Sequence, residues 1–245
     1  MLEVYGLTKT FGALRASDGI DLDVREGETH AIIGPNGAGK TTFISQLAGD
    51  LRPDAGRIVF AGEDVTHLRA PRRARKGLAR SFQITSIYPE FSALTNVALA
   101  VQAHAGHSFR CWRDARRDAA LLDPAHRVLE SVGLGARASA LAANLSHGEQ
   151  RQLEVAMALA TRPRLLLLDE PMAGMGVEES QRMIAFLSTL KRRHTIVLVE
   201  HDMHAVFALA DRVSVLVQGR IIATGTPDAV RTDPAVRTAY LGDVA

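Results

Sequence analysis

Residues 34–42 read Gly34, Pro35, Asn36, Gly37, Ala38, Gly39, Lys40, Thr41 and Thr42, and they directly follow the apolar run Thr29 to Ile33. The spacing fits G-x-x-x-x-G-K-[ST], which joins a buried strand to a helix. Such glycines let the backbone turn tightly and point successive N–H groups inward, and the helix that follows adds the positive end of its dipole. Lys40 supplies a full charge for the β- and γ-phosphates, and Thr41 offers a hydroxyl to Mg²⁺. The sequence therefore predicts a phosphate-binding loop for a nucleotide with Mg²⁺.

Two further apolar runs, Leu165 to Leu168 and Thr195 to Val199, are typical of parallel strands buried on both faces. Short β-like stretches such as Ile20 to Val24 come before the loop, and longer helical patterns alternate with the apolar runs after it. This order predicts an α/β fold in which a mixed sheet leads into α/β units. Ligands in such sheets gather at the carboxyl ends of the strands.

The second apolar run ends in two adjacent carboxylates, Asp169 and Glu170. Asp169 would hold Mg²⁺ through its hydration shell, while Glu170 can reach a water in line with the γ-phosphate. The alternative is an ordinary solvated helix start helped by Pro171. The phosphate loop upstream favours catalysis, so the sequence predicts hydrolysis as well as binding.

Composition excludes several classes of protein. The 245 residues carry 29 Lys+Arg against 27 Asp+Glu, a formal net charge of +2, which argues against a purely electrostatic function. The 47% apolar and 23% charged fractions are those of a soluble globular protein. Because aromatics are only 5%, two basic groups are interpreted as solvated helix faces near an anionic membrane surface or a partner, with no nucleic acid expected. These groups are Arg69, Arg72, Arg73, Arg75, Lys76 and Arg80, and Arg110, Arg113, Arg116 and Arg117.

The chain shows no segment for crossing or entering a membrane. No apolar run approaches the roughly twenty residues of a spanning helix, and the start lacks the pattern of a secretory signal. The single Cys111 cannot form an internal disulfide, so a cytosolic location is expected. From Phe91 to Leu141 the composition turns to Ala, Arg, His and Leu with helical spacing, which predicts a helical subdomain; Trp112 is expected in its core.

Further elements resemble the nucleotide-binding subunits of ATP-binding cassette (ABC) transporters, in that family's order from about Leu2 to Asp228. Residues 145–150, Leu-Ser-His-Gly-Glu-Gln, look like the family's signature, and Gln83 sits where its glutamine loop would fall. His201 fits the switch histidine, and Phe11 takes the place of the aromatic that stacks on adenine.

The resemblance implies a P-loop NTPase fold with a RecA-like core, an antiparallel β subdomain and a helical subdomain. It implies one nucleotide-binding domain over 1–245, with a catalytic core at about 1–90 and 160–230. The helical subdomain would span about 91–159, and a short helical tail 231–245.

The resemblance also implies roles for these residues toward ATP and Mg²⁺. Glu170, His201 and Gln83 would serve catalysis, and Thr41, Gln83 and Asp169 the metal. Ser146 is well placed as a helix N-cap whose free N–H groups can bind a terminal phosphate. In the family this signature closes on the phosphate loop of a second subunit, with Ser146, Gly148 and Glu149 at the nucleotide. His147 and Glu149 replace the usual glycine and glutamine, and Ala173 to Gly176 lacks the usual aspartate.

His201 follows Val199 and Glu200 at a strand end, where its imidazole could hydrogen-bond the γ-phosphate. The other histidines are interpreted as surface residues without a site role: His30, His67, His104, His107, His126, His194 and His204.

Several stretches, including 77–83, 170–175 and 239–242, look similar to the ATPases of importers for branched-chain amino acids, urea and short amides. That similarity implies a peripheral subunit on the cytoplasmic face of the membrane. Its partners would be a second ATPase subunit, identical or different, two transmembrane permeases and, indirectly, an external solute-binding protein. Three alternatives stay open: an exporter ATPase, for example for lipid or lipopolysaccharide, a non-transport ATPase of the same superfamily, and a nucleotide sensor without hydrolysis.

Overall fold

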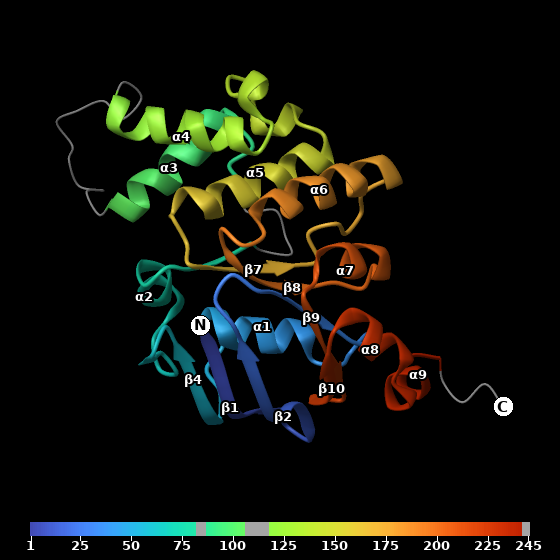
Figure 1. The fold of residues 1–245 in the computed structure, drawn as a ribbon. Helices are drawn as coiled ribbons and strands as arrows, with labels where there is room; N and C mark the ends of the chain where they lie inside the picture. The colour runs from blue at the N-terminus through green and yellow to red at the C-terminus, as the bar shows by residue number, and fades with distance from the viewer. Residues whose placement is uncertain (82–86, 106–117, 242–245) are drawn as a thin grey trace.

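Two sheets and a layer of helices form the molecule (Figure 1). The computed structural model describes residues 1–81, 87–105 and 118–241. The smaller, antiparallel sheet has the order β2-β1-β4-β5, with β1 Leu2–Phe11, β2 Leu14–Val24, β4 Ala55–Phe60 and β5 Glu63–Asp64. The larger sheet has the order β10-β9-β3-β8-β7-β6. Its strands are β3 Thr29–Ile33, β6 Leu78–Arg80, β7 Leu165–Asp169, β8 Thr195–Val199, β9 Arg212–Val217 and β10 Arg220–Gly225.

Five strands of the larger sheet run parallel, and β10 alone pairs antiparallel with β9. The three predicted apolar runs are β3, β7 and β8, and all three are buried along their whole length. They are neighbours in the sheet, so their carboxyl ends meet at one edge. The predicted α/β fold with a mixed sheet, an antiparallel sheet and helices is confirmed.

The helices cover both faces of the larger sheet. They are α1 Lys40–Ala48, α2 Ala70–Arg75, α3 Ala93–Ala105, α4 Ala119–Ser131, α5 His147–Ala160, α6 Val177–Leu190, α7 Met203–Leu209, α8 Pro227–Thr232 and α9 Pro234–Leu241. Two 3₁₀ turns, η2 Gly135–Arg137 and η3 Ala142–Asn144, lead into α5. Among the described residues no helix is long and apolar enough to cross a bilayer.

Alternate side chains of the central strands serve two separate cores. Leu165 and Leu167 of β7 face a core with α1 and the antiparallel sheet. Leu166 and Leu168 face a second core with the helices α3 to α7. Figure 1 shows α1 between the two sheets and α3, α4 and α5 beyond the opposite face of the parallel strands. The helices expected between 91 and 159 thus form one layer on one side of the sheet.

Two arginines of the basic run are not solvated helix faces, which corrects the prediction. Arg73 is 1% exposed, and its guanidinium donates to the carbonyls of Leu68, Gln46, Leu47 and Thr66. Burial lowers its pKa to about 10. Arg80 lies on an edge strand and is paired with acidic side chains. Cys111, Trp112 and the second basic group lie outside the described residues.

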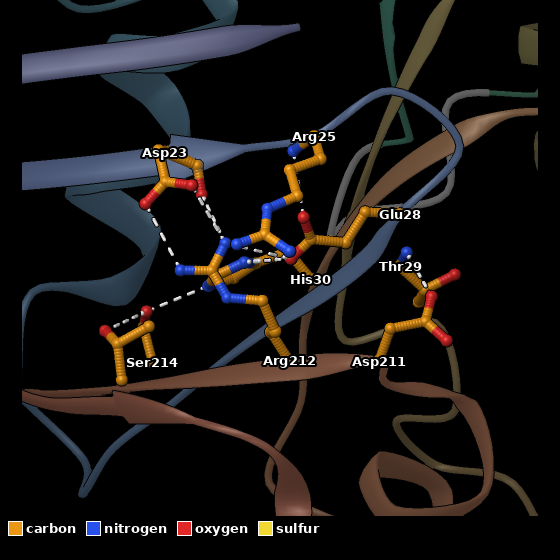
Figure 2. Close-up of polar contacts among 9 residues, drawn as sticks. Asp23, Arg25, Glu28, Thr29, His30, Asp211, Arg212 and Ser214 are labelled. Carbon is orange, nitrogen blue, oxygen red and sulfur yellow. Dashed lines mark hydrogen bonds and ion pairs between the residues drawn. The ribbon is translucent and has the colours of Figure 1, made fainter.

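His30 is also not a surface residue, which corrects a second prediction. Its side chain is fully buried in β3, with Nδ1 2.8 Å from Glu28 Oε1 and Nε2 2.8 Å from Ser214 Oγ. Arg212 lies 3.4 Å from the same carboxylate oxygen and also pairs with Asp23 (Figure 2). The imidazole can be buried because Glu28, just before the same strand, and Ser214, on the neighbouring β9, satisfy both ring nitrogens. His67, His104, His126 and His204 are exposed and His194 is partly buried, while His107 lies outside the described residues.

Candidate nucleotide site

The loop after β3 is shaped by close backbone contacts. At Gly34 an added Cβ would lie 2.1 Å from the carbonyl oxygen of Leu216, and at Gly39 it would lie 2.2 Å from that of Ala16. Gly39 also has a φ of 103°, a conformation that favours glycine. It is the N-cap of α1 and makes no side-chain cap, and the first turn of the helix holds no acidic residue. The first N–H groups of α1 are therefore available to an anion.

Lys40 lies inside the curve of this loop. Its ammonium donates to the carbonyl of Gly34 at 2.6 Å and to that of Pro35 at 3.1 Å. Burial lowers the pKa of Lys40, against the attraction of Glu170 and Asp169. The lysine charge is thus attracted by Asp169, at the end of β7, and by Glu170, which follows it, and a phosphate could replace the carbonyl contacts.

Asp169 and Glu170 stand at the carboxyl end of β7. Glu170 has a φ of 49°, an uncommon conformation for a residue with a side chain, and its N–H donates to the Val199 carbonyl at 2.9 Å. Its side chain is about one-fifth exposed, with a relative accessibility of 20%. The strained turn places this carboxylate at the rim of the site, within reach of water.

Asp169 is almost fully buried, and only one of its oxygens is paired. Arg80 donates to Oδ2 at 3.0 Å and also to Asp50 at 2.8 Å, so it joins β7 to the end of α1. Oδ1 is buried without a hydrogen-bond partner in the structure. Burial raises the pKa of Asp169, and the hydrogen bond and charge of Arg80 oppose that rise. An under-coordinated buried oxygen next to a phosphate loop fits a site for a hydrated Mg²⁺.

The described residues contain no group of three or more His, Cys, Asp or Glu side chains that could hold a metal alone. Mg²⁺ would therefore need phosphate oxygens, together with the exposed Thr41 hydroxyl and Asp169. This donor set fits a metal that arrives with a nucleotide.

His201 follows β8, the strand between β3 and β7. Its Nδ1 lies 3.8 Å from Glu170 Oε1 and 3.8 Å from Glu200 Oε2, and its side chain is 61% exposed. The fold thus brings together the phosphate loop, the carboxylate pair and this histidine. The sequence analysis did not predict Glu200 and Arg80 as site residues. Each is a charged residue at the end of an apolar strand, and that position could have indicated a role in the site.

The signature segment, residues 145–150, forms the capped start of α5. Ser146 is the N-cap of α5, and its Oγ accepts from the Glu149 N–H at 3.2 Å. Glu149 reaches back to the Ser146 N–H at 2.8 Å and also pairs with Arg137 at 3.2 Å. Both oxygens of Glu149 therefore have partners in its own subunit. A cavity of about 820 Å³ is lined by Ser146, Gly148 and residues of α6, with no residue of the phosphate loop.

Within one chain, α5 and α1 lie on opposite faces of the parallel strands (Figure 1). Ser146 and Lys40 are thus separated by the sheet. His147 contacts the loop before α6, where a Cβ at Gly174 would lie 3.3 Å from its Cε1.

Phe11 and Gln83 are the two remaining predicted site residues. Phe11 ends β1 with its side chain about half exposed, and the Lys9 ammonium lies 5.5 Å from its ring centroid. An exposed ring of this kind is available for stacking. Gln83 lies outside the described residues.

Comparison with known proteins gives consistent matches. The profile of the family described as "ABC transporter" matches residues 17–173, and that described as "Branched-chain amino acid ATP-binding cassette transporter" matches 220–245. The high-affinity branched-chain amino acid transport ATP-binding protein BraF of Pseudomonas aeruginosa is 39% identical, covering 99% of this chain and 98% of that protein. A nucleotide-free ATP-binding cassette from an ABC transporter aligns with a TM-score of 0.87, 29% identity and 99% coverage of both chains. A dimeric bacterial ABC transporter cassette shows the same fold, with a TM-score of 0.79 and 24% identity over 93% of this chain and 99% of that one.

Proposed function

Because this chain belongs to the ABC transporter family of ATP-binding proteins, we propose that it binds ATP and hydrolyses it as one subunit of a membrane transporter. The observation that carries this proposal is the meeting of three strand ends. Lys40, the Asp169–Glu170 pair and His201 follow β3, β7 and β8, which are adjacent in one sheet. This arrangement supports roles for Lys40 in holding phosphate, for Asp169 as a metal ligand and for Glu170 as the base.

Within that space each side chain has a distinct task. Lys40 and the N–H groups of the loop bind the phosphates, while Phe11 stacks on the base. Thr41, Asp169 and Gln83 would hold Mg²⁺, which would supply positive charge to the phosphate oxygens. Glu170 orients the attacking water and accepts its proton. His201 donates a hydrogen bond to the γ-phosphate and loses that contact when the phosphate leaves.

A second subunit completes the site. Ser146 and Gly148 lie across the sheet from their own phosphate loop, so they reach a γ-phosphate only on another chain. The Ser146 hydroxyl accepts one intrachain bond and still has a proton to donate. ATP therefore draws two subunits together, and its hydrolysis lets them separate. That a similarly folded cassette is dimeric supports this arrangement.

Two permeases would receive the movement of the ATPase subunits. They would contact each subunit on the side of its helical layer. A cavity of about 380 Å³ lies there, between α2, α3, α5 and β6, and seven of its fifteen lining residues are alanine, with Pro71 and Met157 also among them. Arg80 and Ser81, which lead toward Gln83, also line it. An apolar cleft of this kind suits a permease segment, which would place the subunit on the cytoplasmic face of the membrane.

The transported solute is proposed from the relatives alone. BraF is named for high-affinity branched-chain amino acid transport, and the C-terminal residues 220–245 match a profile named for the same transport. We therefore favour uptake of branched-chain amino acids or related small solutes over lipid export, with an external solute-binding protein as an indirect partner.

Two measurements test this function. The chain purified with its permeases should release phosphate from Mg-ATP, and proteoliposomes should take up a labelled branched-chain amino acid only with ATP inside and a solute-binding protein outside. Binding of ATP without phosphate release would reduce the protein to a nucleotide sensor. Hydrolysis with no solute-dependent stimulation would reject the proposed solute class.

A further inference from the structure

Glu200 is a buried carboxylate that the mechanism above does not use. It directly follows β8, and its exposed fraction is 0%. Burial raises its pKa, and hydrogen bonds from backbone N–H groups oppose that rise. A carboxylate out of water must find partners, and those partners show what the side chain does.

The two oxygens of Glu200 bind two different loops. Oε1 accepts from the N–H of Met172 at 3.1 Å, in the turn that follows β7. Oε2 accepts from the N–H of His201 at 3.0 Å and from that of Asp202 at 3.3 Å, in the turn that follows β8. One side chain thus joins the segment that carries Glu170 to the segment that carries His201.

Capping of the next helix does not explain this arrangement. Asp202 is the N-cap of α7, and its own carboxylate accepts from the N–H groups of His204 and Ala205. Glu200 lies before that cap and makes no hydrogen bond within α7. Its bond to Met172 instead spans 28 positions of sequence between two strand ends.

The geometry points to Glu200 as a positioning residue that fixes the distance between Glu170 and His201. We infer this role on top of the proposed ATPase function, on which it rests. Glu170 is already anchored at its own N–H by the Val199 carbonyl. The carboxylate of Glu200 holds the far side of the same turn at Met172, and it holds the backbone of His201 as well. Loss of these hydrogen bonds would let Glu170 and His201 move independently.

Glu200→Gln tests the inference with little change in shape. A glutamine has one accepting oxygen, and its NH₂ end faces backbone donors, so it can bind only one of the two loops. Because small displacements of catalytic groups are costly, we expect kcat to fall about tenfold to a hundredfold. The dissociation constant for ADP should change by less than about twofold, since the hydrogen bonds of the Glu200 side chain go to Met172, His201 and Asp202 and not to the phosphate loop.

Hydrogen exchange supplies a readout that does not depend on activity. In the nucleotide-free wild type the Met172 and His201 amides should both be protected, although they lie in irregular turns. In Glu200→Gln one of them should exchange faster while amides in the strands do not. Glu28→Gln is the matched control, because Glu28 is also buried and accepts a backbone N–H, from Arg25, at the opposite end of the sheet. It should leave kcat and both amides unchanged.

Each outcome decides the matter. The inference is supported if kcat falls, ADP affinity holds and one turn amide loses protection only in Glu200→Gln. It is overturned if kcat stays at the wild-type level, if kcat falls with both amides still protected, or if these amides exchange freely in the wild type. The last test stands even when the variant fails to fold. An inactive wild-type complex would instead reject the proposed ATPase function.

Discussion

The charged side chains at the two ends of the parallel sheet differ in how completely they are paired. At the amino end Glu28, His30, Arg212 and Asp23 satisfy one another across β2, β3 and β9 (Figure 2). At the carboxyl end, among the residues that the structure describes, Asp169 keeps an oxygen without a partner, and Lys40 donates to two carbonyls of its own loop. The same strands therefore carry a completed network at one end and an incomplete one at the other.

The pKa shifts of the buried carboxylates also differ between the two ends of the sheet. Burial alone would raise the pKa of Glu28, but His30, the Arg25 N–H and Arg212 lower it overall. Burial does raise the pKa of Asp169 and of Glu200 at the other end. Glu200 is compensated by backbone N–H groups, but Asp169 has an oxygen without a partner among the described residues, and such a perturbed group is typical of a binding or catalytic site. The compensated Glu28 instead serves stability. We therefore expect substitutions at the carboxyl end to change chemistry and those at the amino end to change folding.

The largest expected effect comes from Glu170→Gln. Loss of the base should lower kcat about a hundredfold to ten-thousandfold, with ATP still bound and the dimer trapped. Phosphate release and size-exclusion chromatography with ATP measure both results. The melting temperature is the control. It should stay at the wild-type value, because the Glu170 side chain is partly exposed. Turnover near the wild-type rate would show that Glu170 is not the base.

Lys40→Ala should come next. Removing the ammonium loses a charge-assisted contact to phosphate, so the dissociation constant for Mg-ATP should rise about tenfold to a hundredfold. Fluorescence titration with a labelled nucleotide measures this constant. Unchanged affinity would exclude the loop as the phosphate cradle.

Glu28→Ala should show the opposite profile. It leaves the His30 Nδ1 and the Arg25 N–H without their acceptor, so the free energy of unfolding should fall by about 1–3 kcal/mol. Urea denaturation measures this loss, and kcat per folded molecule should stay at the wild-type value. A variant with full stability and reduced kcat would break the distinction between the two ends.

The smallest effect concerns pH. Because the pKa of Glu28 is lower in the folded chain than in the unfolded chain, its ionised form stabilises the fold above the unfolded pKa of about 4.3. That stabilisation is lost as pH falls through the folded pKa. The stability gap between wild type and Glu28→Gln should therefore narrow in acid, as urea denaturation at several pH values would show. A gap that widens in acid would contradict the compensated network.

Contiguous patterns made much of this architecture predictable. The loop from Gly34 to Thr42 and the apolar runs of β3, β7 and β8 are each local in sequence, and their strand ends meet because parallel strands share a direction. Ser146 was recognisable as an N-cap for the same reason.

What could not be predicted depends on partners far apart in the chain. Arg80 meets Asp169 across 89 positions, and His30 meets Ser214 across 184. A basic residue within a basic run is expected to be solvated unless its partners are known. Arg73 is buried because its guanidinium donates to four carbonyls. Hydrophobic periodicity carries no information about such pairings.

The placement of α1 and α5 on opposite faces of one sheet has a kinetic consequence. If each site needs the signature of another chain, the rate per subunit in dilute solution should rise with protein concentration. If two permeases hold a pair of subunits, they would replace that bulk concentration by an effective one, which short tethers set in the millimolar range. The membrane assembly would then act as the switch for the enzyme, because free subunits would consume little ATP.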